Sequence, residues 1–242
     1  MTDPLPPGST VGILGGGQLG RMLAMAAARL GLKTHIFEPG PAPAADVAHR
    51  WTQASYDDAA ALDAFAADCD VITFEFENIP AKALDRLAGA KPIFPRPNAL
   101  EVSQDRLTEK RFLMEQGLST APFAPVDGPG DLPEALAATG LPAILKTRRF
   151  GYDGKGQARV TDTDGAGAAL AELNGAPAIA EGVVAFLSEI SVIAARGQDG
   201  QVAVYDPGEN VHVGGILFTT TVPAALPARR RTDAVLIASR IL

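Results

Sequence analysis

The sequence predicts an α/β protein built from two domains, an open parallel sheet followed by a mixed α+β domain. Short apolar runs alternate with stretches of helical spacing from 11 to 87, which is typical of parallel strands joined by helices. A glycine-rich turn at 15–20 joins the first apolar run to the first helical stretch. Beyond residue 104 most of the apolar runs read as strands, so we place the domains at 1–104 and 105–242.

Each element of the first domain has its own local signal. Gly31 is expected to end the first helix, because glycine is favoured just past a helix C-terminus. Asp57 or Asp58 is expected to cap the second helix, and Pro80 suits the first turn of the third. The expected strands are 11–14, 34–37, 71–74 and 93–94, and the expected helices are 22–30, 59–67 and 80–87.

The second domain opens with a charged helix, 106–116, which Asp105 caps and Gly117 ends. A last helix starts at Pro227 and reaches residue 242 without a C-cap signal, so the chain is expected to be cut short. We divide this domain into 105–180 and 181–242. Its expected strands are 143–147, 157–160, 178–180, 188–194, 202–205 and 216–221, with a helix near 168–173.

Composition excludes several classes of function. The 242 residues are 47% hydrophobic and 20% charged, which is typical of a globular chain with a sizeable core. A formal net charge of -7 argues against nucleic-acid or anionic-membrane partners, because both require clustered cations. Cys69 is the one cysteine, so there is no internal disulfide, and no Cys/His spacing resembles a zinc site. Without a signal-peptide pattern, the expected compartment is the cytoplasm.

A second glycine-rich segment, 151–157, follows an apolar run that carries Lys146. Its three glycines allow backbone N–H groups to approach an anion, and Lys146 and Lys155 can offset polyphosphate charge. The segment is not a Walker motif, because Gly156 stands where that motif needs Ser or Thr after the lysine. We therefore predict a lid over phosphates.

The first glycine-rich turn matches a dinucleotide-binding pattern through Gly15, Gly17 and Gly20, with Glu38 at the end of the next strand. The alternative is a tight turn whose helix N-terminus binds any phosphate. Nothing further along the chain supports hydride transfer, and a dehydrogenase has no need of the second anion site around Lys146. An NAD-dependent dehydrogenase remains an alternative.

Acidic residues mark two further candidate positions. Glu75 and Glu77 follow the third strand, at the edge where parallel sheets bind ligands, and Glu77 can instead cap the next helix. The segment 181–184 joins two expected strands and can hold an adenine edge through backbone groups, while Glu189 can accept from ribose hydroxyls. That segment can also be an ordinary turn, and His212 can contact a phosphate or sugar or be structural.

Four motifs together carry a family resemblance. They are Gly-Gly-Gly-Gln-Leu-Gly-Arg-Met at 15–22, Thr-Phe-Glu-Phe-Glu-Asn-Ile-Pro at 73–80, Asp-Arg-Leu-Thr-Glu-Lys at 105–110, and Lys146 with the segment 151–157. With them the chain closely resembles the 5-(carboxyamino)imidazole ribonucleotide synthase family, which are ATP-grasp ligases of purine biosynthesis, over essentially its whole length. The resemblance implies a Rossmann-like pre-ATP-grasp domain followed by an incomplete α+β ATP-grasp domain.

The resemblance also implies roles for individual residues. Gln18, Leu19, Glu75 and Tyr152 match positions that hold the ribonucleotide, so that the first glycine turn serves a sugar phosphate. Lys146 and Lys155 would carry catalysis by charge neutralisation. The implied ATP contacts are Arg106, Lys146, Gly151, Tyr152, Asp153, Gly154, Lys155, Gly156, Gln157, Glu181, Gly182, Val183, Val184, Glu189 and His212.

The implied reaction uses ATP and Mg²⁺ to convert bicarbonate to carboxyphosphate, whose carboxyl group is transferred to aminoimidazole ribonucleotide by a protein that is usually a homodimer. Family members continue well beyond this length, and their Mg²⁺ ligands are expected after residue 242. We therefore expect this polypeptide by itself to be nearly inactive, and a non-catalytic nucleotide-binding fragment is the alternative. Glycinamide ribonucleotide transformylase and biotin carboxylase are the nearest rivals, although 74–80 favours the imidazole substrate.

Overall fold

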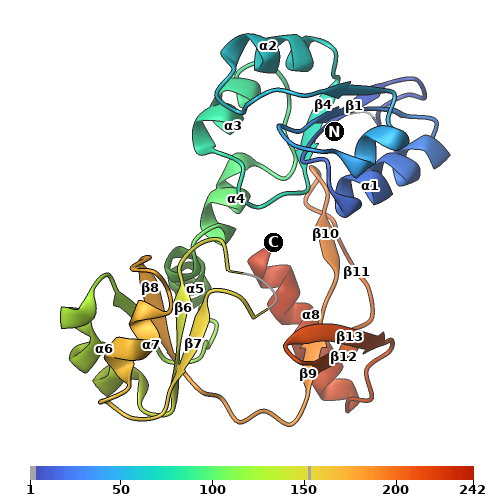
Figure 1. The fold of residues 1–242 in the computed structure, drawn as a ribbon. Helices are drawn as coiled ribbons and strands as arrows, with labels where there is room; N and C mark the ends of the chain where they lie inside the picture. Colours follow the sequence, from blue (N-terminus) through green and yellow to red (C-terminus); the bar gives the residue numbers. More distant parts are fainter. Residues whose placement is uncertain (1–3, 152–153) are drawn as a thin grey trace. The chain divides into compact units, whose positions relative to one another are not determined.

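The structure is a computed structural model that describes residues 4–151 and 154–242 (Figure 1). The chain forms two compact units, one ending at Gln104 and the other running from Asp105 to Leu242. The first unit is built on a parallel sheet, and the sheets of the second are antiparallel.

Four parallel strands form the sheet of the first unit, in the order β3-β2-β1-β4. The parallel sheet predicted from the sequence is confirmed. The strands are β1 (Thr10–Leu14), β2 (Lys33–Phe37), β3 (Arg50–Thr52) and β4 (Val71–Phe74). The helices are α1 (Gln18–Arg29), η1 (Pro43–Asp46), α2 (Ala59–Ala67), α3 (Ala81–Ala88) and α4 (Pro97–Ser103).

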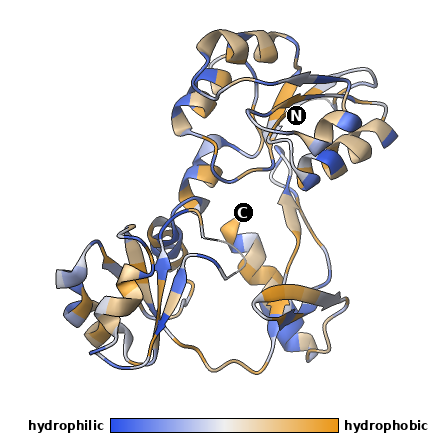
Figure 2. Cartoon of the chain, viewed as in Figure 1, coloured by the Kyte–Doolittle hydropathy of each residue, from blue (hydrophilic) through white to orange (hydrophobic). Residues whose placement is uncertain are grey.

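Both faces of this sheet are covered, which explains why consecutive residues of its central strand are buried. Leu14 belongs to a core with Phe65 of α2 and the inward residues of α3. Ile13, which points to the opposite face, packs with Ile36 and Ala44. Strands covered on both faces have continuous apolar runs, and Figure 2 shows this hydrophobic colouring along the sheet.

One strand expected in the first unit was wrong. Residues 93–94 do not form a strand, because Ile93 makes a single parallel bridge to Ile72 and goes no further. Pro92 and Pro95 flank this pair and have no N–H to donate to a ladder. Helix α4, which was not predicted, starts at Pro97, since proline is well suited to the first position of a helix.

The second unit begins with α5 (Arg106–Glu115), capped as predicted by the side chain of Asp105. A four-stranded sheet follows, in the order β5-β8-β6-β7. Its strands are β5 (Phe123–Val126), β6 (Ala143–Thr147), β7 (Gln157–Val160) and β8 (Ala178–Gly182). The helical segments η2 (Pro129–Asp131), α6 (Leu132–Thr139) and α7 (Ala166–Ala171) complete it, and α6 and α7 share its core (Figure 1).

Further strands and a long helix form the rest of the unit. A three-stranded sheet has the order β13-β12-β9, and β10 pairs with β11 in a separate hairpin. The strands are β9 (Glu189–Ser191), β10 (Ala194–Arg196), β11 (Val202–Val204), β12 (Gly208–Val213) and β13 (Ile216–Thr221). The long helix is α8 (Ala228–Ile241). The side chains of β13 are all exposed. No described helix combines the length and hydrophobicity of a membrane span.

Two boundaries in this unit differ from the expected ones. The single strand expected at 188–194 was wrong, because this stretch contributes to β9 and β10, which lie in different sheets. An apolar run does not indicate where a chain leaves one sheet for another. The proposed division after residue 180 falls inside β8, which continues to Gly182.

Candidate functional site

Lys146 and Glu181 lie on the same face of the β5-β8-β6-β7 sheet. Glu181 pairs directly with Ile144, so Lys146 is its diagonal neighbour, two residues along β6. Leu145 points the other way, into the core shared with α6 and α7, because side chains alternate along a strand. The alternation of β6 therefore turns Lys146 away from that core, and its Nζ donates to Glu181 Oε2 at 2.8 Å.

Lys110 of α5 reaches the same carboxylate. Its Nζ lies 3.3 Å from Glu181 Oε1, so two ammonium groups hold one carboxylate. The three side chains are only 14% (Lys110), 22% (Lys146) and 10% (Glu181) exposed. Burial by itself would raise the pKa of Glu181, but the hydrogen bonds and charges of Lys146 and Lys110 outweigh it and lower that pKa.

Arg106 and Glu109, also on α5, complete what we call the Lys146 cluster, namely Arg106, Glu109, Lys110, Lys146 and Glu181. Burial raises the pKa of the Glu109 carboxyl, and the positive charges of Arg106, Lys110 and Lys146 counteract this only in part. Three cations face two carboxylates in this cluster, which leaves a surplus of positive charge. Such a partly buried positive surplus favours an anionic ligand.

The ends of the glycine-rich segment 151–157 are fixed beside this cluster. Arg106 Nη2 donates to the carbonyl of Gly151 at 2.9 Å, and the N–H of Thr147 donates to the carbonyl of Gly156 at 2.8 Å. Gly156 has φ +68°, and a Cβ there would lie 2.6 Å from Thr147 Oγ1. Glycine is therefore required at this position by conformation and by space.

The remaining residues of the segment are either exposed or outside the described part of the chain. Gly154 has φ +79° and is exposed, as are Lys155 and Gln157. Tyr152 and Asp153, two of the predicted ligands, lie outside the described residues.

Asp105 fixes the start of α5 relative to the end of β6. Its Oδ1 accepts from the N–H groups of Leu107 and Thr108 at 2.9 and 3.2 Å, and its carboxylate receives Arg148 Nε at 2.9 Å and Nη2 at 2.8 Å. Burial alone would raise the pKa of Asp105, but the Arg148 and N–H contacts outweigh it and lower that pKa. This joint sets the positions from which Arg106 and Lys110 point.

The segment 181–184 is part strand and part connection. The N–H of Gly182 donates to Pro122 O at 2.9 Å, and the N–H of Val183 donates to Pro142 O at 3.2 Å. These two donors are therefore already used, and Glu181 is committed to lysines through its side chain. Val183 and Val184 are exposed, so any adenine contact here has to use other backbone groups or their apolar surfaces.

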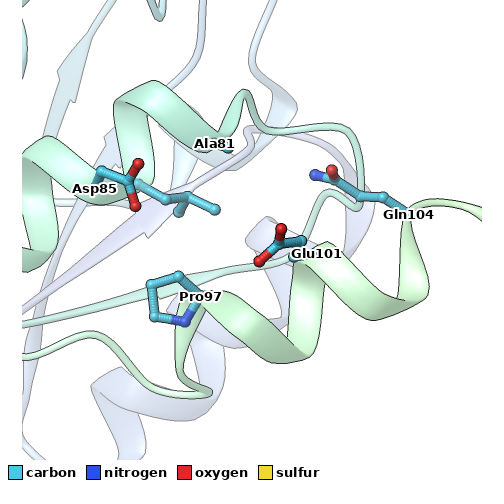
Figure 3. A pocket seen from close by; sticks show the side chains of 6 residues that line it. Ala81, Asp85, Pro97, Glu101 and Gln104 are labelled. Atoms are coloured by element: carbon cyan, nitrogen blue, oxygen red, sulfur yellow. The ribbon is translucent and has the colours of Figure 1, made fainter. Parts of the chain in front are cut away.

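Glu189 and His212 meet across β9 and β12. His212 Nδ1 lies 3.4 Å from Glu189 Oε1, and both side chains are partly exposed. They line a cavity of about 380 Å³ together with neighbours from 186–188 and 209–211. A small space between α3 and α4, lined by Asp85 and Glu101 among others, has only about 30 Å³ and contains none of the predicted residues (Figure 3).

The first glycine turn brings together the residues predicted to bind the ribonucleotide in the first unit. Gln18 and Leu19 begin α1 and are exposed. Glu75 Oε1 accepts from the N–H of Gly17 at 2.9 Å, directly before them. Glu77 is exposed, and α3 has no side-chain cap among the described residues, so the capping alternative for Glu77 was wrong.

Sequence reasoning missed Glu109, Lys110 and the contact of Glu38 with the turn. Arg106, Glu109 and Lys110 have the i, i+3, i+4 spacing that places side chains on one helix face. This spacing could have identified Glu109 and Lys110 from the sequence. Within the described part of the chain, no group of three His, Cys, Asp or Glu side chains could hold a metal ion.

Comparisons with known proteins identify the two domains of the chain. Residues 9–104 match the ribonucleotide synthetase preATP-grasp domain, and residues 111–242 match the ATP-grasp domain. The chain is 55% identical to the N5-carboxyaminoimidazole ribonucleotide synthase of Brucella melitensis biotype 1, over 98% of this chain and 67% of that protein. The corresponding protein of Pseudomonas aeruginosa is 40% identical, over 90% of this chain and 60% of its own length.

Solved structures give the same result. An ADP complex of N5-carboxyaminoimidazole ribonucleotide synthetase superposes with a TM-score of 0.94 at 38% identity, covering 100% of this chain and 64% of that one. The Aspergillus clavatus synthase in complex with ADP and 5-aminoimidazole ribonucleotide gives 0.86 at 27% identity, covering 97% and 62%. The chain thus spans roughly two thirds of the length of these relatives. It belongs to the N5-carboxyaminoimidazole ribonucleotide synthase family of ATP-grasp proteins.

Proposed function

We propose that this chain takes part in the ATP-dependent carboxylation of 5-aminoimidazole ribonucleotide with bicarbonate, in purine biosynthesis. The observation that carries the proposal is the Lys146 cluster beside the fixed ends of the segment 151–157, in a chain 55% identical to a synthase of this name. ATP would supply the phosphoryl group that activates bicarbonate as carboxyphosphate. The amine of the ribonucleotide then takes the carboxyl group.

The chain's own residues would act by positioning and by charge. Phosphoryl transfer needs little covalent chemistry from the protein, so aligned donors and cations supply most of the catalysis. Lys146 and Arg106 come from fixed elements, and Lys155 comes from the segment that would cover the phosphates. Glu181 would hold Lys146 in place until a phosphate competes for it.

We propose that Glu189 and His212 serve the sugar or a phosphate of the nucleotide, since they share a cavity large enough for part of such a ligand. Glu75, with Gln18 and Leu19, would face the ribonucleotide at the first glycine turn.

We also propose that Mg²⁺ accompanies the ATP phosphates, as is usual for ATP-dependent enzymes. The residues at 4–151 and 154–242 include no group of three His, Cys, Asp or Glu side chains that could hold the ion. A cytoplasmic homodimer is proposed as well. A single buried cysteine is consistent with a reducing compartment, and light scattering would test the dimer.

The test is residual ADP formation that depends on both aminoimidazole ribonucleotide and bicarbonate, since this polypeptide by itself is expected to be nearly inactive. Lys146→Met should abolish it, while Lys82→Met, at an exposed lysine of α3, should leave it unchanged. Calorimetric titrations with ATP and with NADH separate the alternatives. ATP binding without turnover would contradict the catalytic proposal and favour a nucleotide-binding role, whereas tight NADH binding without ATP binding would favour the dehydrogenase.

A further inference from the structure

We propose that the first glycine turn is closed to phosphate, because the protein's own carboxylates already occupy the N–H groups of Gly16 and Gly17. Glu38 and Glu75 would thus determine specificity by exclusion. The turn follows a parallel strand and opens a helix of 12 residues, which is the arrangement that binds phosphate in dinucleotide sites. In this chain, carboxylates of the protein itself bind to the turn in place of a phosphate.

Two consecutive N–H groups of the turn are engaged by side chains. The N–H of Gly16 donates to Glu38 Oε2 at 3.0 Å, and the N–H of Gly17 donates to Glu75 Oε1 at 2.9 Å. The other oxygen of Glu38 accepts from the N–H of Gly40 at 2.9 Å, so this carboxylate is fixed at both oxygens. A phosphate oxygen would have to displace a carboxylate to reach either of these two donors.

The glycine pattern itself is explained by this internal anion. A Cβ on Gly15 would lie 2.6 Å from Glu75 Oε1, and a Cβ on Gly17 would lie 3.3 Å from the same atom. A Cβ on Gly20 would lie 3.4 Å from it and 2.9 Å from the carbonyl oxygen of Gly15. The glycines that match a pyrophosphate motif therefore make room for the carboxylate of Glu75.

The charge of the site also opposes a phosphate. Among the described residues, Lys, Arg and His side chains make no ion pair with Glu38 or Glu75. Tyr56 contributes a neutral phenol, because burial, followed by the charges of Glu38 and Glu75, raises the pKa of its hydroxyl. An incoming phosphate would meet two negative charges compensated only by peptide dipoles.

The test is a titration of the ¹⁵N-labelled chain with inorganic pyrophosphate, followed at the amides of Gly16 and Gly17. In the wild type these amides should show no saturable shift, and their hydrogen exchange should be slow with or without pyrophosphate. The Glu38→Ala/Glu75→Ala variant should gain a saturable shift, with an apparent affinity stronger by about tenfold or more. The Glu38→Gln/Glu75→Gln variant keeps a side-chain oxygen that can accept from each of the two backbone N–H groups. Its turn should therefore remain closed to pyrophosphate.

Saturable wild-type shifts at Gly16 and Gly17, or fast exchange of these amides, would overturn the inference even if the alanine variant failed to fold. A folded alanine variant without any gain would overturn it as well. Shifts at Lys146 and Thr147 report the proposed ATP site separately, so a failure of that proposal would be distinguishable.

Discussion

Lys110→Met tests how the Lys146 cluster shares its charges. The change removes one of the two ammonium groups on Glu181, at 3.3 Å, and leaves Lys146 at 2.8 Å. At an effective dielectric constant of 20, each contact corresponds to about 5–6 kcal/mol of Coulomb energy before desolvation is subtracted. Because Glu181 keeps one partner, we expect the free energy of unfolding to fall by only about 1–2 kcal/mol, less than for a fully broken buried pair.

The effect on nucleotide binding should be separate from this loss of stability. In the wild type, Lys110 can continue to neutralise Glu181 when Lys146 turns to a phosphate. In the variant, a phosphate that takes Lys146 leaves Glu181 without an ammonium partner. We therefore expect ATP affinity to fall about tenfold, or about 1.4 kcal/mol. Lys110→Arg keeps the charge and should retain most of the affinity.

Calorimetric titration with ATP measures this effect, and its pH dependence makes the test specific. Lys110 helps to lower the pKa of Glu181, so the variant's Glu181 should take up a proton at higher pH than in the wild type. A protonated Glu181 no longer needs Lys146, so the affinity deficit should shrink as pH falls. Wild-type affinity in the variant, or a deficit that does not change with pH, would refute this reasoning.

Three further predictions concern stability and the glycine-rich segment. Asp105→Ala should lower the free energy of unfolding, measured in urea, by about 2–4 kcal/mol, since it loses the helix cap and the ion pair with Arg148. Asp105→Asn keeps a capping oxygen and should lose less. Equal losses of unfolding free energy in the two variants would contradict this. Gly156→Ala should weaken ATP binding, measured by calorimetry, more than Gly154→Ala does. Both residues have positive φ, but only at position 156 would a Cβ lie against Thr147. Equal effects of the two variants would show that the contact with Thr147 is unimportant. Burial lowers the pKa of His35 below its ordinary value of 6.5. The stability that the neutral imidazole contributes is therefore present above pH 6.5 and is lost as pH falls. In urea titrations, the free energy of unfolding should drop more between about pH 7 and pH 5 for the wild type than for His35→Gln.

The sequence predicted those strands whose apolar runs have clear local ends. Strands β4, β6, β7 and β13 were predicted with the bounds that the structure gives. Strand β5 and helix α6 were not predicted, because their stretch is rich in proline and alanine and lacks a distinct period. Strand β3 has only three residues and is defined by its pairing with β2, which local patterns do not report.

The candidate site was predictable where its residues are close in sequence. Lys146 and the segment 151–157 stand within a few residues of each other, so their motif was visible. The partners that give these residues their electrostatic setting come from far along the chain. Lys146 is 35 residues from Glu181, and Gly17 is 58 residues from Glu75. Such pairings follow from strand register, which composition and spacing do not encode directly.

The two glycine-rich turns illustrate why motif and function separate. Each has glycines that allow backbone N–H groups to approach an anion, and from sequence each could bind phosphate. Around the first turn the sheet order brings β2 and β4 to either side of β1, and both strands are followed by a glutamate that bonds to the turn. Around the second, strand register and α5 bring cations, including Arg106 on the Gly151 carbonyl. The sign of the charges that the fold places beside a glycine turn, and not the spacing of its glycines, therefore decides whether an anion can enter it.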